Sequence, residues 1–381
     1  MLSFLGLLNS SNSSNSSNSS NSSNSSNSSN SSNSSNGFAG LSGAVSNPML
    51  VNGLVQSTGA LGESDAKLNT RKRWLTARAL PPMEDHAKSL PQHDATTRFH
   101  LALLELTAGL GVKVSAPDTV QVTLEGQDWL TLQRPSFTQF AKQLDWVMRR
   151  SRLRPERTSE ILSQVVPQYA YWTGIVGLHP DTTPRTLELS YIALHWSMVM
   201  CQRLKHALTT PRPHEYSPMV QPIILTPPYG AWPMGHATEA YMFAKVMSSL
   251  VGVGPSDPLH EQLHLLARRI SDNRVIAGVH FPIDSPAGYF LADRLALAFV
   301  ARCTDQKVPS KIAIPDGALL GTALANVDVD PGLVFESNGA WAKPSGPAPA
   351  KQTTTVKVTP SPLMAEMWQR ARKELRDHGW A

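Results

Sequence analysis

Residues 9–36 form an unbroken Asn-Ser-Ser repeat that contains no apolar side chain. Such a segment cannot offset the entropy cost of ordering its backbone by burying apolar surface. We therefore expect residues 1–66 to be a low-complexity, flexible tether. Residues 336–381 are expected to form a linker rich in Pro, Ala, Lys and Thr, followed by an amphipathic helix at 363–377 that docks on the body or on a partner.

The remaining region, residues 67–335, is long enough for one large domain or two small ones. Proline and glycine clusters, notably within 211–233, divide it into amphipathic segments, which is typical of a helical bundle. Residues 120–132 alternate and are expected to form a hairpin. The sequence thus predicts an all-α fold, a helical bundle with a disordered N-terminal tether. The expected helices span 97–110, 136–151, 157–166, 185–208, 236–250, 258–270, 274–280 and 286–302.

The charge balance is mildly basic, with 34 Lys and Arg against 29 Asp and Glu, a net charge of +5. This excess fits an anionic substrate, or a merely solvated basic surface. The cluster Arg71-Lys72-Arg73 is short, and no basic stripe with interleaved aromatic residues occurs, so nucleic acid is not expected as a partner.

The sequence contains no run of eighteen apolar residues, so we expect a soluble protein rather than an integral membrane protein. The apolar residues 1–8 lack the basic flank of an ordinary signal peptide, and the compartment, cytoplasmic or exported, stays open. Cys201 and Cys303 alone make neither a zinc motif nor a disulfide framework. The oligomeric state is also open.

Three short segments carry the candidate chemistry, and the first holds Lys205 and Arg212. Seven residues are nearly two helical turns, so the two cations can point the same way if the helical turn continues. Pro213 directs Arg212 out of the helix. An Arg fork and a Lys point charge together suit a tetrahedral oxyanion. The alternative is that both only complement the dipole at the helix C-terminus.

The second segment places Gly235 and His236 at a helix start. Glycine lets the backbone approach an anion closely, and the free N–H groups of the first turn point toward it. A histidine cation there faces the positive end of the helix dipole, which indicates a task such as proton donation to a leaving group. The alternative is a surface histidine in a loop.

The third segment, residues 273–284, is apolar apart from its functional groups. Arg274 and His280 are six apart and can reach a common cavity. Asp284 follows His280 by four residues and can hold one ring nitrogen, either along a helix or across a bend at Pro282, which leaves the other nitrogen free to attack or to ligate. The alternative is a core helix with a structural Arg–Asp bridge.

In order, these segments read K-x6-R-P, P-x-G-H and R-x5-H-x3-D. Together they resemble the three-part signature of the type 2 phosphatidic acid phosphatase (PAP2) superfamily, which also holds the bacterial acid phosphatases and the vanadium-dependent haloperoxidases. The resemblance covers the chain from Lys205 to Gly288, and Gly288 matches a glycine that the family often has after its aspartate. It implies the helical bundle of these enzymes.

The resemblance also implies roles for individual residues. His280 would be the nucleophile that forms a phosphohistidine, or the ligand to vanadium in a haloperoxidase, and Asp284 would orient it. His236 would be the general acid toward the leaving group and then the base toward water. The equatorial oxygens would be bound by Lys205, Arg212, Arg274 and the backbone N–H of Gly235.

One position departs from the family pattern, because Met234 stands where the family usually has serine. One hydroxyl contact to the oxyanion is then missing, at a cost on the order of 2.7–4 kcal/mol. Thr238 and Tyr229 are candidates to replace it. Tyr216, Tyr229 and Trp232, in the loop between the first two motifs, either shape a substrate pocket or only pack.

Three functions follow from this pattern. The favoured one is hydrolysis of a small-molecule phosphate monoester without a cofactor, because the short interval between His236 and Arg274 is typical of the phosphatases. The second is a haloperoxidase that binds vanadate in the same pocket and oxidises halide with hydrogen peroxide. The run Thr226-Pro227-Pro228 and the long helical front half resemble that branch. The third is an oxyanion-binding protein without turnover.

Overall fold

The computed structural model describes residues 52, 56, 90, 91, 93–166, 168–314 and 354–380. The chain divides into two compact units, Met1–Asp85 and His86–Ala381, and all the candidate site residues belong to the second. The predicted tether, apart from residues 52 and 56, lies outside the described residues, as do Arg71-Lys72-Arg73 and the part of the linker before residue 354.

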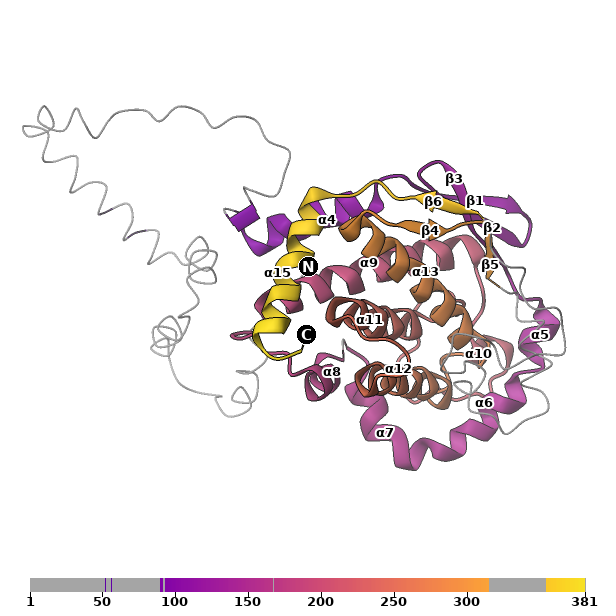
Figure 1. Cartoon of the computed structure of the whole chain (residues 1–381). Helices are drawn as coiled ribbons and strands as arrows, with labels where there is room; N and C mark the ends of the chain where they lie inside the picture. The colour runs from indigo at the N-terminus through magenta and orange to yellow at the C-terminus, as the bar shows by residue number, and fades with distance from the viewer. Residues whose placement is uncertain are drawn as a thin grey trace, which may run out of the picture. The chain divides into compact units, whose positions relative to one another are not determined.

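The second unit is mostly helical, as the sequence predicts, and the helix α11 lies at its centre (Figure 1). Small residues on α11 let it pack closely against α13, α12 and α9. The helices are α4 (Ala95–Thr107), α5 (Phe137–Ala141), α6 (Leu144–Arg150), α7 (Arg154–Ser163), α8 (Tyr169–Val176), α9 (Pro184–Leu208), α10 (Pro213–Tyr216), α11 (Gly235–Val251), α12 (Pro258–Ile276), α13 (Asp284–Thr304) and α15 (Pro362–Asp377), with a 3-10 turn, η4 (Ser151–Leu153).

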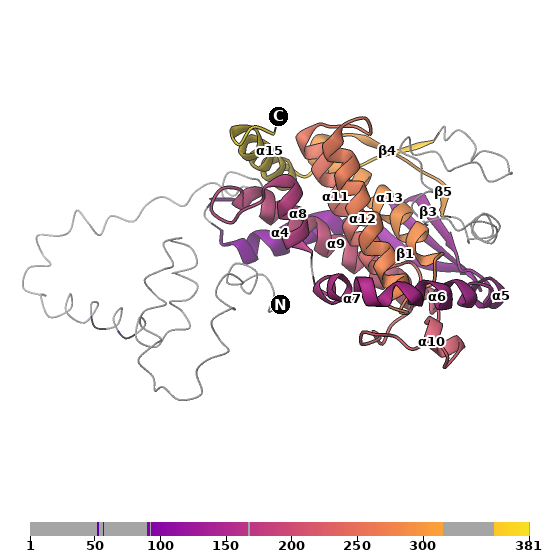
Figure 2. The same ribbon diagram turned by 90° about the horizontal axis from the view of Figure 1, so that it is seen from below.

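A row of short helices, α5, α6 and α7, runs along one side of this bundle (Figure 2). Of these, α6 and α7 contact α12. The sequence predicts one helix over 136–151, but the structure divides it at Lys142 and Gln143. Every helix of the described residues is too short or too polar to cross a bilayer.

The unit also contains two small sheets, so the prediction of a purely α fold is too narrow. The expected hairpin over 120–132 is present as β2 (Thr119–Leu124) and β3 (Gln127–Gln133), which pair antiparallel. The first sheet has the order β1-β2-β3-β5 and the second pairs β4 with β6. The other strands are β1 (Leu110–Ala116), β4 (Lys307–Pro309), β5 (Ile312–Ile314) and β6 (Thr355–Lys357).

The C-terminal helix α15 docks on α9, which decides between the two places that the sequence leaves open for it. The N-cap of α9, Thr183, makes no side-chain cap bond. Instead the Glu374 carboxylate accepts hydrogen bonds from the backbone N–H groups of Arg185 at 3.0 Å and Thr186 at 2.7 Å. A carboxylate at this end also complements the helix dipole. The first turn of α9 is therefore capped from the last helix of the unit.

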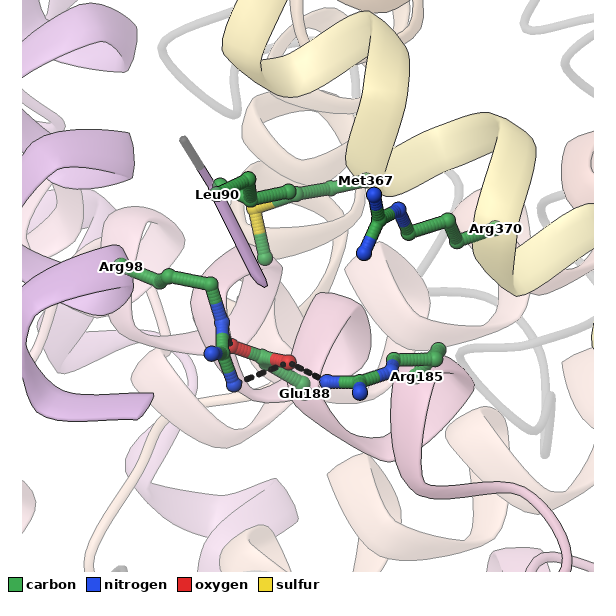
Figure 3. Close-up of a pocket in the computed structure, with 6 residues that line it drawn as sticks. All are labelled: Leu90, Arg98, Arg185, Glu188, Met367 and Arg370. Carbon is green, nitrogen blue, oxygen red and sulfur yellow. Dashed lines mark hydrogen bonds and ion pairs between the residues drawn. The ribbon is translucent and has the colours of Figure 1, made fainter. Parts of the chain in front are cut away.

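A buried ion pair fixes the same end of α9 to α4 (Figure 3). Arg98 of α4 contacts both carboxylate oxygens of Glu188 of α9, at 2.5 and 3.0 Å. Arg185 adds a longer contact of 3.4 Å to the same carboxylate, and Arg370 of α15 extends toward this cluster. The bidentate geometry makes this a directional contact between two helices.

The predicted helix over 274–280 is wrong. Helix α12 continues from Pro258 to Ile276, and Gly278 then adopts a left-handed φ of +85°, which ends the helix. The chain turns through His280 and Pro282 before α13 begins at Asp284. The third motif therefore spans the end of one helix, a turn and the start of the next.

Candidate active site

The seven candidate residues lie at helix ends and in the turns between them. The pKa of His280 is lowered by burial and by the charges of Arg212, Lys205, His236 and Arg274, so these groups lie within electrostatic reach of one ring. The structure thus brings the three motifs together. Their residues come from the last turn of α9 (Lys205), the N-cap of α10 (Arg212), the first turn of α11 (Gly235, His236), the last turn of α12 (Arg274), the following turn (His280) and the start of α13 (Asp284).

His280 and Asp284 form a buried pair across the bend before α13. The imidazole Nδ1 lies 2.7 Å from Asp284 Oδ2, which also accepts the backbone N–H of Phe281 at 2.9 Å. Burial raises the pKa of Asp284 to about 7, against the Phe281 N–H and the charges of Lys205 and Arg212. The carboxylate fixes the proton on Nδ1, so Nε2 carries the lone pair and accepts from Arg212 Nη1 at 3.1 Å.

Lys205 and Arg212 meet although the helix does not continue between them. Thr209 adopts a left-handed φ of +47° and ends α9. The Lys205 ammonium donates to the carbonyls of Gly230 at 2.7 Å and Ala231 at 2.9 Å, while Arg212 donates from Nε to Tyr229 O at 2.9 Å. Burial lowers the pKa of Lys205 to about 8. Both cations therefore hold the 229–231 segment over the site, rather than capping the carbonyls of α9.

The start of α11 leaves room for a ligand. Met234, the N-cap, supplies no side-chain cap bond. Apart from its chain neighbours and the helix backbone, a Cβ placed on Gly235 would find a single atom within 4 Å, Glu239 Oε1 at 4.0 Å. His236, one residue later, contacts the carbonyl of Gln164 through Nε2 at 3.0 Å. Its pKa is lowered to about 3, chiefly by burial and then by the Arg274 charge.

Arg274 is the candidate cation with unused donors. Its side chain is only 1% exposed, and Nη2 donates to Ile161 O at 2.9 Å and more weakly to Gln164 Oε1 at 3.4 Å. Nε and Nη1 are buried without a hydrogen-bond partner among the described residues. Burial lowers the pKa of Arg274 to about 10, but it stays charged at neutral pH. Buried donors without a protein partner are rare, and these two are available to a ligand.

Of the two hydroxyls suggested as substitutes for the missing serine, that of Thr238 has another partner. Thr238 donates its hydroxyl to the Met234 carbonyl at 2.8 Å, which engages it within α11. Tyr229 presents its ring face to Lys205 and Arg212, each 5.3 Å from the centroid. Met234 itself is fully buried, and its sulfur accepts from Ser285 at 3.7 Å.

Of the three aromatic residues in the loop between the first two motifs, two pack against neighbouring side chains and one lines a cavity. Trp232 is fully buried, and Tyr216 packs against Phe140 and Phe281. Tyr229 instead lines a cavity of about 650 Å³ that reaches Lys205 and Gly230. Its other lining residues are Gln202, His206, Thr209, Thr210, Pro211, His214, Glu215, Thr226, Pro227 and Pro228.

Sequence reasoning missed two residues of the site, Gln164 and Glu239. Gln164 is the C-cap of α7, and it contacts His236 through its carbonyl and Arg274 through its side chain. Nothing in the local pattern around it signals this role. Glu239 is the sole carboxylate of α11, a helix otherwise nearly free of charge, and that isolation was a usable signal.

Comparison of the chain with models of known families and with curated proteins finds no match. Within the described ranges, no cluster of three or more His, Cys, Asp or Glu side chains is placed to hold a metal ion. Cys201 and Cys303 are buried free thiols.

Proposed function

We propose that the chain hydrolyses small-molecule phosphate monoesters and belongs to the PAP2 superfamily, with the helical bundle of the acid phosphatases and haloperoxidases. One observation carries this proposal. The Nε2 lone pair of a neutral His280, oriented by Asp284, lies in a group of three buried cations of which Arg274 has free donors. Such a site offers a nucleophile and preformed donors to a tetrahedral dianion.

Binding uses the three cations and the start of α11. Arg274 offers Nε and Nη1, which have no other partner among the described residues, and Gly235 leaves open space for a close approach. Lys205 and Arg212 exchange carbonyl contacts for contacts to the phosphoryl oxygens. These donors act most strongly in the trigonal-bipyramidal transition state, where the equatorial oxygens gather charge.

The chemistry then proceeds in two displacements. Nε2 of His280 forms a bond to phosphorus, while the bond from phosphorus to the ester oxygen breaks and that oxygen takes a proton from His236. Asp284 stabilises the positive charge that develops on the His280 ring. In the second step His236 takes a proton from water, whose oxygen bonds to phosphorus as the bond from phosphorus to nitrogen breaks. Phosphate leaves and the ring is regenerated.

His236 must be protonated in the first step, although burial and the cations lower its pKa to about 3. A bound dianion cancels much of the repulsion from Arg274, Lys205 and Arg212, and so raises this pKa. The proposal therefore couples protonation of His236 to substrate binding, and it predicts an optimum on the acid side of neutrality.

The test is p-nitrophenyl phosphate hydrolysis by the wild type and His280→Ala. The control is His100→Ala, which removes an exposed imidazole from α4, away from the site. We expect turnover in the wild type and the control, and its loss in His280→Ala. Wild-type phosphatase activity in His280→Ala overturns the proposal.

A parallel assay measures bromination in the presence of vanadate and hydrogen peroxide. The same residues fit vanadate, with His280 Nε2 as its ligand, and vanadate would supply peroxide activation. Bromination that requires vanadate, without phosphatase activity, assigns the haloperoxidase function instead. Phosphate binding with neither activity assigns an oxyanion-binding protein without turnover.

A further inference from the structure

Glu239 is a carboxylic acid that the proposed mechanism does not use. It lies on α11, one turn after Gly235, and is half-buried. Its side chain makes no hydrogen bond or ion pair within the part of the chain that the structure describes. A half-buried carboxyl group that no protein group engages is free to contact a bound ligand, as acceptor when ionised and as donor when protonated.

The carboxyl group lies beside Gly235 at the start of α11. Apart from the chain neighbours and the helix backbone, Oε1 is the single atom within 4 Å of a Cβ built on Gly235, at 4.0 Å. The carboxyl group therefore borders the same open space that the glycine leaves for a ligand. The second indication of a ligand here is Arg274, whose Nε and Nη1 are buried without partners.

The groups around Glu239 come from three helices. Lys205 and Cys201 of α9 and Tyr169 of α8 all interact with it electrostatically, and Tyr169 is largely buried. His236 precedes it by three residues on α11. Burial raises the pKa of Glu239 to about 7, and Lys205 opposes the rise. Below neutral pH the carboxyl group is therefore mostly protonated.

The charge state decides what Glu239 does to an anion. As a carboxylate it repels a phosphate dianion and cancels part of the Lys205 charge. As a neutral acid it carries an O–H donor, and a protonated carboxylic acid in an apolar site is an effective oxyanion donor. The hydroxyl donor of the family pattern is absent at Met234, and Thr238 does not replace it because its hydroxyl is engaged with the Met234 carbonyl.

We propose that Glu239, as a neutral acid, donates a hydrogen bond to an oxygen of the oxyanion beside Gly235, and so replaces the hydroxyl that Met234 lacks. The inference rests on the proposed function only in requiring that a phosphate-like oxyanion binds here. It makes Glu239 a catalytic residue, since it touches the phosphoryl group.

The test is the dissociation constant of inorganic phosphate, measured calorimetrically from pH 5.5 to 8.5 for the wild type, Glu239→Gln and Glu239→Leu. Glutamine keeps the shape and donates through its amide at every pH, while leucine donates at none. The ionisation of phosphate is common to all three proteins, so the ratio of constants at each pH isolates position 239.

We expect the wild type and Glu239→Gln to bind alike at pH 5.5, and the wild type to bind at least 10-fold more weakly than Glu239→Gln at pH 8.5. Glu239→Leu should bind at least 10-fold more weakly than Glu239→Gln throughout. A ratio of wild type to Glu239→Gln that is constant with pH overturns the role of Glu239 and leaves the proposed function standing. Absence of phosphate binding in the wild type overturns both.

Leucine at this position can also disturb packing, so unfolding in urea is measured for each variant. The ratio of the wild-type dissociation constant to that of Glu239→Gln, followed across the pH range, tests the role of Glu239 even if Glu239→Leu unfolds. If Glu239 served only to stabilise α11, Glu239→Gln would change the free energy of unfolding and leave that ratio flat.

Discussion

Nη1 of Arg212 lies 3.1 Å from Nε2 of His280, so a permanent cation faces the ring nitrogen that is assigned to attack phosphorus. This contact and burial keep the imidazole neutral. In the proposed mechanism, Arg212 has to turn from the ring toward the phosphoryl group when substrate binds. The proposed nucleophile and one of its proposed donors are thus in contact before substrate arrives.

Replacing Asp284 by Asn should lower kcat for p-nitrophenyl phosphate roughly 10²–10⁴-fold, because an amide no longer enforces the proton on Nδ1. Phosphate affinity should change little. Steady-state kinetics and calorimetry measure the two effects. The matched control is Asp293→Asn on the same helix, which removes an ion pair of 2.6 Å with Lys245 away from the site and should leave kcat unchanged. Unchanged kcat in Asp284→Asn would contradict the assigned role.

Alanine substitutions at two glycines should affect different properties, the stability at Gly288 and the phosphate affinity at Gly235. A Cβ on Gly288 would lie 2.7 Å from both the Met234 carbonyl oxygen and Ala237 Cβ, so α13 and α11 must separate. Gly288→Ala should lower the free energy of unfolding by about 1–3 kcal/mol. Gly235→Ala meets no atom closer than 4.0 Å and should keep its stability.

The added methyl group of Gly235→Ala fills the space assigned to the oxyanion, so phosphate should bind roughly 10-fold more weakly, which is about 1.4 kcal/mol. Urea unfolding and phosphate titration of both variants test the pair. Equal phosphate affinity in Gly235→Ala and the wild type would place the oxyanion elsewhere.

His264 should make the protein sensitive to acid. Its ring stacks on His260 at a centroid distance of 4.1 Å, and its Nε2 is buried without a partner among the described residues. Burial, with the charges of Lys245 and His260, lowers its pKa to about 3. The folded protein therefore binds fewer protons than the unfolded chain between about pH 6.5 and 3, and stability falls as the pH falls through this window.

The expected slope for His264 is up to about 1.4 kcal/mol per pH unit below pH 6.5. His264→Phe should flatten the dependence of the unfolding free energy on pH between 7.5 and 5, and the exposed control His206→Gln should not. Unfolding in urea at several pH values gives both slopes. Parallel curves for His264→Phe and the wild type would show that this ring is protonated in the fold.

Arg274 and Arg98 are both buried, but replacing each by methionine should affect different properties, phosphate affinity for Arg274 and stability for Arg98. Arg98 has a bidentate partner in Glu188, so Arg98→Met leaves a buried carboxylate and should cost about 3–5 kcal/mol of stability, less whatever Arg185 compensates. Arg274→Met removes two donors without partners and should cost clearly less. It should instead weaken phosphate binding roughly 10- to 100-fold. A larger loss of stability in Arg274→Met than in Arg98→Met would make Arg274 structural.

Much of the helical frame follows from local signals in the sequence. Pro184 and the left-handed Thr209 bound α9, and the helix predicted over 185–208 differs from it by one residue. The helices predicted over 236–250 and 363–377 also agree with α11 and α15 to within one residue. Periodicity and terminal glycine or proline are sufficient here because each helix buries a continuous face.

The errors have physical causes that lie beyond such local patterns. The sequence does not predict strand β1. Its residues 113–116 are exposed to solvent, so they bury no apolar face, and they form a strand by pairing with β2. The helix predicted over 274–280 is wrong because Gly278 adopts a left-handed conformation, which ends α12. Within the site, the spacing of the motifs predicted which side chains converge on His280. The carbonyl partners of Lys205 and the placement of Glu239 depend on tertiary packing, which spacing does not encode.

Glu374 of α15 contacts the first turn of α9, nearly 190 residues earlier in the chain. During translation, all seven candidate residues leave the ribosome before Glu374, whose carboxylate caps the first turn of α9. A nascent or truncated chain that stops before α15 would contain all seven candidate residues but lack the contact between Glu374 and α9. We therefore expect α9 to gain its N-terminal cap only late in translation, when α15 packs against its first turn.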